Sequence, residues 1–453
     1  SSSIPKFIHQ STLMKPLKIL FATMPLDGHF NPLTGLAVYL REQGHDVRWY
    51  TGGPYADKAE RLGIPAYRFR KARVINQENF NDLFPERKTI RGKIARLKFD
   101  IKHLFILPVH DYMTDLFVVR EAFAFDLMVC DSLFCAGQVV QHVFRVPVVS
   151  VGVVPLTENS RDLPPSGLGL TPSSGWLGRQ KQALLRFVTD RMFRESTQVY
   201  NEVIAAFGLP PQRDSIFNIG VRSADVYLQS GVPGFEYKRS DMSKKVRFVG
   251  AMLPHRTGAK KPFAHAAKLS QHKKVILATQ GTVEQDVEKL LVPTLEAFKD
   301  SEHLVVVTTG GSGTADLRAR YPQANVIIED FIDFDVIMPH ADVYVTNAGY
   351  GGVMLSIQHH LPMVVAGVHE GKSEIAARVG YFGLGENLRT ETPTPKQLRQ
   401  AVEKVLTSRE YRQNVIRLSH EFRSFNPNLL SEQYITDVVE KHEAQRERRV
   451  GAG

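Results

Sequence analysis

Cysteine is almost missing from this sequence, which holds only Cys130 and Cys135, both in apolar surroundings. Two such thiols support neither a disulfide framework nor a zinc site, and a reducing cytoplasm suits them better. Long apolar runs are missing too, because no stretch reaches the roughly 18–20 residues that span a bilayer. Residues 1–16 are polar and lack the apolar core of a secretory signal. We therefore expect a cytoplasmic protein in which residues 1–14 are a disordered leader or tag remnant and Met14 is a candidate native start.

Nucleic-acid-binding modules such as Cys/His fingers are also absent from the sequence. Lys and Arg number 57 against 47 Asp and Glu, so the net charge is +10 and an anionic partner is favoured. That partner could be a nucleotide sugar, anionic lipid or nucleic acid, but the charge is spread along the chain and we expect no nucleic acid. A chain of 453 residues exceeds one ordinary core, so two domains are expected.

The rest of the chain is organised around residues 342–377. Residues 342–346 and 362–367 have the pattern of buried strands, and helices are predicted over 353–360 and from Ile375. A glycine-rich turn, Asn347-Ala348-Gly349-Tyr350-Gly351-Gly352, joins the first strand to the first helix. Backbone amides at the start of a helix bind phosphate well, which predicts a diphosphate site at Gly349–Gly352. The alternative is a tight strand-to-helix turn of any α/β protein.

A second candidate site lies near the N-terminus. Residues 17–23 and 46–51 are predicted strands, and Asn31-Pro32 is predicted to open the helix between them. His29 would then lie on the loop at the carboxyl edge of the sheet, where ligands bind in open α/β folds. The positive end of the helix dipole favours a neutral imidazole, which can serve as a general base. The alternative is a histidine that only hydrogen-bonds within a turn.

Asp131 ends the predicted strand 125–131 and would share that edge with His29. A carboxylate bonded to a catalytic imidazole fixes its tautomer and stabilises its protonated form. The alternative role for Asp131 is to cap the helix predicted at 134–143.

The remaining segments repeat an α/β rhythm. The first half adds strands at 148–154 and 225–229, a long helix at 179–207, and a Pro-, Gly- and Ser-rich loop at 155–178 that is expected to line the substrate site. Strands at 246–250, 274–278, 304–308 and 325–328 begin the second half, where Thr279–Thr282 form another turn suited to phosphate or sugar. We predict an α/β fold with domains at 15–240 and 241–425, and a C-terminal helix within 426–453.

Two segments have competing interpretations. Residues 87–103 are basic, with apolar residues at near-helical spacing, and could contact a membrane surface or form a solvated helix face. Asp333-Phe334-Asp335 resembles a metal-binding D-x-D string, but carboxylates that open a helix also complement its dipole. We expect no metal site.

Three signatures carry a family resemblance. They are FATMPLDGHFNPLTGLAVYLREQGHDV, with a G-H-x-x-P core at 28–32; the strand-end aspartate of DLMVCD; and TNAGYGGVMLSIQHHLPMVVAG followed by EGKSEIAARVGYFGLGENL. From Lys15 to the C-terminal helix, the chain resembles the inverting nucleotide-sugar glycosyltransferases that include macrolide, flavonoid and glucuronosyl transferases. This resemblance implies the GT-B fold, in which two Rossmann-like domains face each other across a cleft and a C-terminal helix crosses back to the first domain.

The resemblance also implies roles for particular residues. His29 matches the general base, and Asp131 matches its orienting partner. Phe331 matches an aromatic residue that stacks on the donor base, and backbone groups at Ile332 pair with the base edge. The residues matched to the diphosphate and its surroundings are Gly28, Gly281, Thr282, Asn347, Gly349, Gly351 and Gly352. The donor would be a UDP-sugar such as UDP-glucose, with a dTDP-sugar as the alternative and no metal required.

Several positions depart from the family pattern. Asn347 replaces a histidine, and Leu355 replaces a glutamate that grips the ribose hydroxyls, which leaves UDP against dTDP open. An Asp-Gln pair that reads the sugar is missing, and Glu370 or Gly371-Lys372 stand near its place. Glu370 could accept from sugar hydroxyls, whereas Lys372 would favour an acidic or unusual sugar. The plant-type donor signature is absent, which points to a bacterial-type relative.

Three functions remain open at this point. The leading one is transfer of a sugar to a hydroxyl of a small apolar or aromatic acceptor such as a phenolic, flavonoid or polyketide. The second is a peripheral-membrane glycolipid transferase of the same fold that uses 87–103 to contact lipid. The third is a dinucleotide-dependent oxidoreductase, although GHFNPLTG at 28–35 is not a G-x-G-x-x-G motif. A relative that kept the fold and lost the chemistry is also open.

Overall fold

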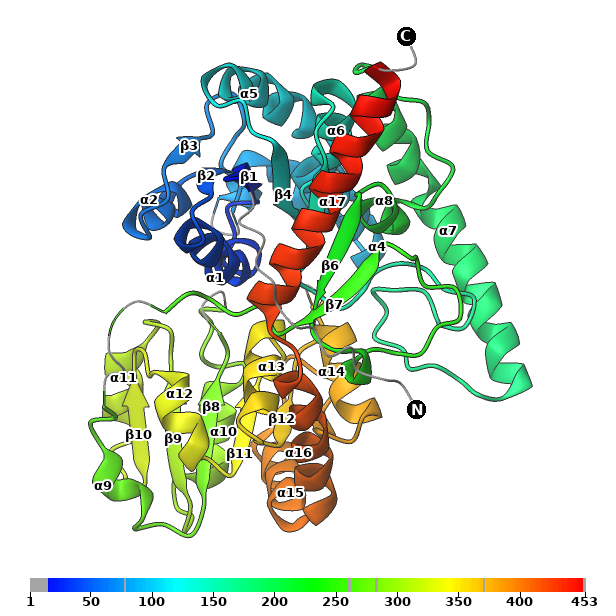
Figure 1. The fold of residues 1–453 in the computed structure, drawn as a ribbon. Coiled ribbons are helices and arrows are strands. Elements are labelled where there is room, and N and C mark those ends of the chain that lie inside the picture. Colours follow the sequence, from blue (N-terminus) through cyan, green and yellow to red (C-terminus); the bar gives the residue numbers. More distant parts are fainter. Residues whose placement is uncertain are drawn as a thin grey trace.

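The protein is built on two parallel β-sheets, one in each half of the chain (Figure 1). The computed structural model describes residues 15–76, 79–256, 258, 262–281, 284–369 and 371–450. The first sheet contains β1 (Lys18–Ala22), β2 (Asp46–Thr51), β3 (Ala66–Arg68), β4 (Leu127–Asp131), β5 (Val148–Gly152), β6 (Val226–Ser230) and β7 (Val246–Gly250). The second contains β8 (Val275–Thr279), β9 (Leu304–Thr308), β10 (Val326–Glu329), β11 (Val343–Thr346), β12 (Met363–Val365) and β13 (Gly385–Asn387).

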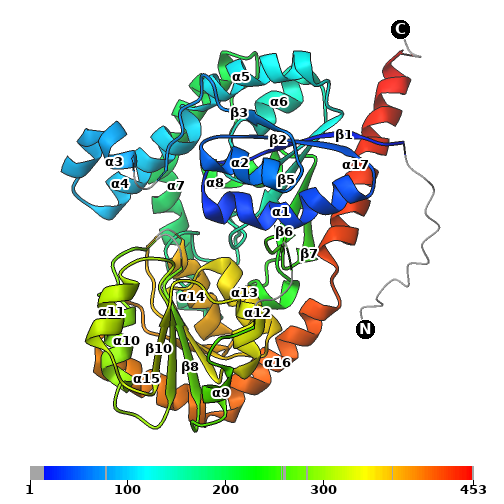
Figure 2. The same cartoon turned by 90° about the vertical axis from the view of Figure 1, so that its left-hand side faces the viewer.

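Helices connect these strands and cover both faces of each sheet (Figure 2). In the first half they are α1 (Asp27–Glu42), α2 (Pro54–Arg61), α3 (Phe80–Leu83), α4 (Lys93–Asp100), α5 (Val109–Ala122), α6 (Gly137–Phe144), α7 (Trp176–Ala205) and α8 (Ile216–Arg222). In the second half they are α9 (Ala266–Leu269), α10 (Leu291–Phe298), α11 (Thr314–Arg320), α12 (Phe334–Ile337), α13 (Tyr350–Gln358), α14 (Lys372–Tyr381), α15 (Pro395–Thr407), α16 (Arg409–Arg423) and α17 (Pro427–Val450). Short turns of helix lie at η1 (Pro85–Thr89), η2 (Ile101–Ile106), η3 (Pro233–Phe235) and η4 (Met338–His340).

Both sheets reverse their strand order at one point. The first runs β3-β2-β1-β4-β5-β6-β7 and the second β10-β9-β8-β11-β12-β13. The order therefore reverses between β1 and β4 in the first sheet and between β8 and β11 in the second. Ligands of open α/β sheets bind beyond the carboxyl ends of the strands at such a point. His29 and Asp131 follow β1 and end β4, while Gly281 and Asn347 follow β8 and β11, so these four predicted site residues lie at the reversals.

Alternating side chains of the central strands supply separate cores on the two sides of each sheet. On β1, Leu20 and Ala22 join the core covered by α5, α6 and α7, whereas Ile19 and Phe21 join the opposite core with α1. Helix α17 adds Ile435 and Val439 to the α1 side, and the Tyr39 hydroxyl of α1 donates to Glu432 at 2.6 Å. The C-terminal helix thus crosses back onto the first domain, as Figure 1 shows.

Five predicted helix starts are wrong by three or four residues, and two of these are α6, which begins at Gly137 instead of 134, and α7, which begins at Trp176 instead of 179. Helix α1 begins at Asp27, not at Asn31-Pro32, so His29 lies in its first turn. Asp27 favours this earlier start because a carboxylate complements the helix dipole and here also bonds Asn31 at 3.2 Å. Helix α13 begins at Tyr350 and α14 at Lys372, because glycines before them turn the chain directly into each helix.

The division between the two sheets lies after residue 250. Strand β7 pairs with β6 in the first sheet, although the sequence assigned it to the second half with a boundary between 240 and 241. The sequence of a short apolar segment predicts that it forms a strand, but it does not predict which other strand it pairs with. The segment that leaves β7 therefore carries the chain across to the second domain.

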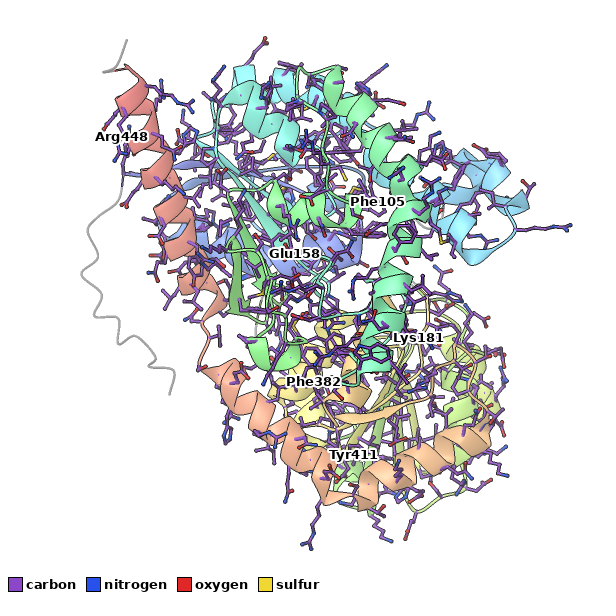
Figure 3. All side chains as sticks on the ribbon, turned by 90° about the vertical axis from the view of Figure 1, so that its right-hand side faces the viewer. Phe105, Glu158, Lys181, Phe382, Tyr411 and Arg448 are labelled. Carbon is purple, nitrogen blue, oxygen red and sulfur yellow. The ribbon has the colours of Figure 1, made fainter. Side chains whose placement is uncertain are left out.

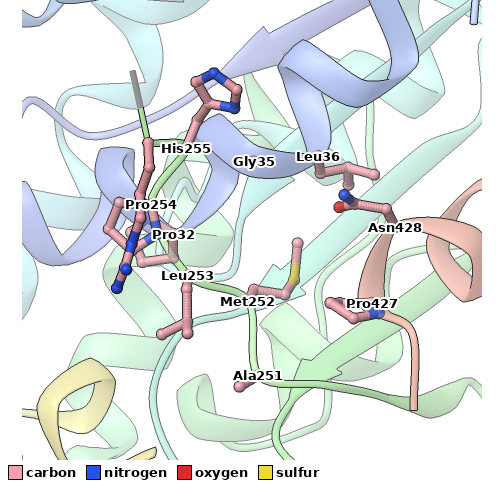
Figure 4. Close-up of a pocket in the computed structure, with 11 residues that line it drawn as sticks. Pro32, Gly35, Leu36, Ala251, Met252, Leu253, Pro254, His255, Pro427 and Asn428 are labelled. Carbon is pink, nitrogen blue, oxygen red and sulfur yellow. The ribbon is translucent and has the colours of Figure 1, made fainter. Parts of the chain in front are cut away.

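This crossing segment is held against α1. The His255 N–H donates to the Thr34 hydroxyl at 2.7 Å, and a Cβ built at Gly35 would lie 2.9 Å from the carbonyl oxygen of Leu253. A cavity of about 250 Å³ remains beside it, lined by Met252, Leu253 and Pro254 on one side and by Pro427 and Asn428 at the start of α17 on another (Figure 4). Both crossings between the domains therefore border this cavity. Across the described part of the chain, no helix combines the length and apolar character needed to traverse a membrane.

Candidate active site

His29 and Asp131 form a direct hydrogen bond at the edge of the first sheet. The His29 Nδ1 atom lies 2.8 Å from Oδ1 of Asp131. The carboxylate is fully buried, with 0% exposure, whereas 13% of the imidazole is exposed. Because a carboxylate accepts, Nδ1 carries the proton and Nε2 keeps a lone pair for another proton. This is the arrangement that the sequence predicted for a general base and its orienting partner.

The Asp131 carboxylate is itself held by the backbone. Its Oδ2 accepts from the N–H of Met24 at 3.0 Å, and its Oδ1 accepts from the N–H of Leu133 at 3.0 Å. The alternative role, capping the next helix, is wrong, since Ala136 occupies the N-cap position of α6. Asp131 instead ties the end of β4 to the loop after β1 and orients the imidazole.

The first turn of α1 presents His29 from a supported position. Asp27 accepts from the Lys58 ammonium at 2.9 Å and from the Asn31 amide. No described heavy atom lies within 4 Å of a Cβ built at Gly28, so the backbone beside His29 is open to close approach. A reacting group could therefore approach the start of α1 without displacing protein atoms.

The two cysteines lie close to this pair but are not nucleophiles at neutral pH. Burial raises the pKa of the Cys130 thiol well above its usual value, and the nearby Asp131 adds to the effect. Burial likewise raises the pKa of Cys135 to about 12, with Asp131 again contributing. Both side chains therefore stay protonated thiols.

The glycine-rich turn after β11 has the geometry of an anion site. Ala348 adopts a left-handed backbone with φ +65°, and Gly349 is the N-cap of α13 without a capping side chain from the described residues. A Cβ built at Gly349 or Gly351 would meet no described heavy atom within 4 Å. At Gly352 it would lie 3.0 Å from the Tyr344 hydroxyl, so that glycine serves packing. The amides of the first turn of α13 are thus approachable by phosphate.

The turns after β8 and β11 lie against each other. The buried Asn347 side chain donates through Nδ2 to the carbonyl of Gln280, which leaves its second amide hydrogen for another acceptor. Gly281 has φ +78°, and a Cβ built there would lie 3.9 Å from the Asn347 amide. Thr282 and Glu370, both predicted donor residues, lie outside the described residues.

Phe331 and Ile332, which follow β10, differ in how far their side chains are exposed. The Phe331 side chain is 71% exposed and lies near Gly311, where a built Cβ would be 3.7 Å from the ring. Ile332 is partly buried and packs against the second domain's core. An exposed aromatic ring beside a buried anchor suits the stacking role predicted for Phe331.

Two positions that depart from the family pattern have different surroundings. Leu355 is buried in the core of the second domain, so its side chain packs instead of facing a ligand. Lys372 begins α14. A Cβ built at Gly367 would lie 3.2 Å from the Cβ of Lys372 and would also meet the carbonyl oxygen of Asn347, so these three residues are close neighbours. Burial would raise the pKa of Glu284, but the Lys289 ammonium and the N–H of Asp286, with a smaller contribution from the charge of Lys372, hold that pKa below its usual value.

The carboxylates of the D-x-D string already have partners. Asp333 caps α12 by accepting from the N–H of Asp335 at 3.0 Å. Asp335 pairs with the Arg256 guanidinium and lies 2.8 Å from His359 Nε2. The predicted position of these carboxylates at the start of a helix is confirmed, and the Arg256 guanidinium and the His359 imidazole contact the Asp335 carboxylate.

Tyr350, which the sequence reasoning did not single out, joins the carboxyl edges of the two sheets. Its hydroxyl donates to the carbonyl of Ser230, the last residue of β6, at 2.7 Å. A Cβ at Gly231, where φ is +117°, would lie 2.9 Å from that hydroxyl, so only glycine leaves room. Because Tyr350 opens α13 after β11, the His29–Asp131 pair and the glycine-rich turn lie on facing edges.

Glu374 is a second residue that sequence reasoning did not identify. Its Oε1 accepts from the N–H groups of Gly167 and Gly169, both at 2.9 Å, across the domain boundary. Its Oε2 lies 3.0 Å from the Arg378 guanidinium. The loop expected to line the acceptor site is thus seated on the start of α14. The spacing of Glu374 and Arg378, four residues apart on a predicted helix, was the available signal.

Arg378 continues this network into the first domain. It is only 2% exposed and lies 2.6 Å from Glu236, which also pairs with Arg239 at 3.0 Å. Burial would raise the pKa of Glu236, but the guanidiniums of Arg378 and Arg239 outweigh it and hold that pKa below its usual value. A buried ion cluster therefore locks α14 to the first domain.

Solved structures share this architecture. The kitacinnamycin glycosyltransferase superposes with a TM-score of 0.74 at 17% identity, covering 94% of this chain and 100% of the other. The calicheamicin glycosyltransferase superposes with a TM-score of 0.71 at 20% identity, covering 94% and 99%. The fold is therefore GT-B, as predicted.

Sequence relatives then identify the family. The 4'-demethylrebeccamycin synthase of Lentzea aerocolonigenes is 37% identical over 406 residues, 89% of this chain and 95% of its own. A UDP-glycosyltransferase of Phaeomoniella chlamydospora is 28% identical over 90% of this chain and 92% of its own. Residues 293–436 match the C-terminal domain described as erythromycin biosynthesis protein CIII-like. The chain belongs to the natural-product family of GT-B glycosyltransferases, and the oxidoreductase alternative is wrong.

Proposed function

We propose that this enzyme transfers a sugar from a UDP-sugar, such as UDP-glucose, to a hydroxyl of a small apolar or aromatic acceptor, with His29 as the general base. The hydrogen bond between His29 and Asp131 is the observation that carries this proposal. It leaves Nε2 of a partly exposed imidazole as the proton acceptor, at the edge that faces the glycine-rich turn.

The reaction balances without a further reagent. His29 Nε2 takes the hydroxyl proton as the acceptor oxygen bonds to the anomeric carbon. The bond from that carbon to the phosphate oxygen breaks, and the nucleoside diphosphate leaves with the electron pair. Attack from the face opposite the leaving group inverts the configuration. Asp131 stabilises the imidazolium that forms.

The donor would occupy the second domain. Amides at the start of α13 and the open approach at Gly349 and Gly351 suit a diphosphate, and the exposed ring of Phe331 suits a base. Asn347 offers an amide hydrogen, and Lys372 a positive charge at the start of α14. Helix dipole and cation together could balance the leaving diphosphate, so we propose that no metal is required.

The relatives support UDP as the nucleotide. Relatives from Phaeomoniella chlamydospora and Beauveria bassiana are named UDP-glycosyltransferase and UDP-glucosyltransferase. A dTDP-sugar is the competing donor, because a solved structure of the same fold, a spinosyn rhamnosyltransferase, is a complex with thymidine diphosphate. The buried Leu355 supplies no carboxylate for the ribose, so the nucleotide must be chosen by other groups.

A donor screen by calorimetry tests this assignment. UDP, dTDP and GDP would each be titrated with and without magnesium, followed by transfer assays on a panel of phenolic and polyketide acceptors. We expect UDP to bind most tightly, magnesium to leave its affinity unchanged, and the product to carry the inverted anomer. Tighter binding of dTDP would reassign the donor, and binding that required magnesium would overturn the metal-free mechanism.

A further inference from the structure

Helix α7 has two apolar faces, and only one of them is covered. Phe193, Tyr200 and Val203 are buried against the first domain. On the opposite side of the N-terminal half, five large apolar residues are between 42% and 74% exposed: Trp176, Leu177, Leu184, Phe187 and Val188. We call these five residues the α7 face.

Their spacing makes the α7 face continuous. Leu177, Leu184 and Val188 are separated by seven and four residues, and Phe187 lies three residues after Leu184, so all four share one side of the helix. Single exposed apolar residues are ordinary on protein surfaces. A contiguous group rimmed by polar residues instead marks a membrane or protein contact.

The charges around the α7 face have mostly one sign. Four exposed cations accompany it along the helix: Arg179, Lys181, Arg191 and Arg194. Lys181 is labelled in the lower half of α7 in Figure 3. The acidic residues of the same stretch are Asp190 and Glu195, and Glu195 lies 2.6 Å from Lys98 of α4. The stretch therefore presents excess positive charge beside exposed apolar side chains.

Helix α4 extends this character. It lies beside α7 in the opposite views of Figures 2 and 3, and the ion pair between Lys98 and Glu195 joins the two helices. Ile94 and Leu97 are exposed on it, next to the exposed Arg96. Residues 87–102 contain seven basic side chains and one acidic one, Asp100, which pairs with Arg87 at 2.6 Å.

We infer that the α7 face and α4 dock on an anionic lipid surface. Trp, Phe and Leu side chains beside Lys and Arg are the composition of helices that lie in a membrane interface. The cations would meet lipid phosphates while the apolar side chains enter the boundary with the acyl chains. The loop that precedes α7, residues 155–175, is expected to line the acceptor site, and we call it the acceptor loop. It runs directly into α7, so docking brings that loop to the lipid. This inference does not depend on the proposed transfer reaction.

Trp176 allows a direct test. The chain has two tryptophans, and the other, Trp49, is fully buried. Adding vesicles of phosphatidylcholine with phosphatidylglycerol to the full chain at low salt should shift the Trp176 emission to the blue, and brominated lipid should quench it. Pure phosphatidylcholine vesicles and high salt should weaken both effects, because the cations are screened.

Matched variants distinguish docking through the α7 face from nonspecific adsorption of the protein to vesicles. Leu184→Asp and Phe187→Asp should each reduce co-sedimentation with anionic vesicles by roughly tenfold. Val118→Asp is the control, because Val118 lies on α5, outside the α7 face, and its side chain is 50% exposed. This variant should leave co-sedimentation unchanged. Equal binding by all variants would overturn the inference, as would no binding of the wild type at low salt. A doubled mass in solution with Trp176 already shielded would assign the face to a second copy of the chain instead.

Discussion

The imidazole of His29 and the carboxylate of Asp131 are joined by a 2.8 Å hydrogen bond, although 102 residues separate them in the sequence. The bond spans the point where the first sheet reverses its strand order, from the first turn of α1 to the end of β4. Two backbone N–H groups donate to the Asp131 carboxylate and hold it in position to bond the imidazole. The pair is therefore pre-organised before any substrate arrives.

Replacing the carboxylate tests the orienting role. Asp131→Asn should lower the transfer rate by a factor of roughly 10²–10⁴, because an amide neither fixes the same tautomer nor stabilises the imidazolium. UDP affinity should stay within about twofold, since Asp131 lies on the other domain. Asp126→Asn is the matched control, because Asp126 also accepts a backbone N–H, from Lys18 at 2.7 Å, and lies at the start of the same strand. A normal rate in Asp131→Asn would remove Asp131 from the mechanism.

Phe331 should account for much of the affinity for the nucleotide base. Phe331→Ala is expected to weaken UDP binding by about 5- to 150-fold, since stacking of a base on an aromatic ring is worth roughly 1–3 kcal/mol. The ring is 71% exposed, so folding should be unaffected. Phe331→Trp should retain affinity, and Phe117→Ala, which removes an exposed ring of the first domain, should have no effect. Calorimetric titration of UDP distinguishes these outcomes, and unchanged affinity in Phe331→Ala would refute the stacking role.

Gly169 should be needed to seat the acceptor loop on α14. Gly169→Ala is expected to cost about 1–2 kcal/mol locally because φ is +63° there. Its Cβ would also lie 2.7 Å from the Cβ of Ser373. We predict a several-fold higher KM for the acceptor, unchanged UDP affinity, and faster amide exchange over residues 160–175.

Gly175→Ala is the control for this variant. It lies in the same loop, has φ −75°, and would meet no described heavy atom within 4 Å. Its kinetics and exchange should match the wild type. If both variants behaved like the wild type, the contact between the loop and Glu374 would have no role in acceptor binding.

The ion pair between Glu236 and Arg378 predicts a pH dependence of stability. The folded-state pKa of Glu236 lies below its ordinary value of 4.5, so the pair stabilises the folded state fully above about pH 4.5. That contribution is lost as the pH falls through the lower folded-state pKa. Glu236→Gln should be destabilised by about 3–5 kcal/mol at pH 7, because it leaves Arg378 buried without that charge. Thermal melts should show the difference between wild type and variant shrinking below pH 4.5; a constant difference would contradict this assignment.

Much of the fold and part of the site could be read from the sequence. The apolar strands, the Gly-rich turn and the strand-end Asp131 are local patterns, and parallel strands bring their carboxyl ends to one edge. That is why the sequence alone predicts that His29 and Asp131 lie together. The predicted start of α1 is wrong because Asn31-Pro32 is typical of the opening of a helix, whereas Asp27 and its partners start the helix earlier.

Contacts between the domains could not be predicted. Tyr350 meets Ser230 and Glu374 meets Gly167 only because two separate sheets face each other, and no periodicity within a segment encodes that geometry. The same holds for β7, whose partner is set by the sheet and not by its own residues. Likewise, the exposure of the α7 face follows from which side of the helix the domain covers.

The most direct test of the catalytic account is a paired measurement on the wild type and His29→Ala. Calorimetry would give the affinity for UDP, and a transfer assay with UDP-glucose and an accepted phenolic or polyketide would give the rate. We expect equal UDP affinity and a rate lower by a factor of roughly 10²–10⁴ in His29→Ala. A variant that binds UDP equally and transfers sugar at the wild-type rate would show that His29 is not the base.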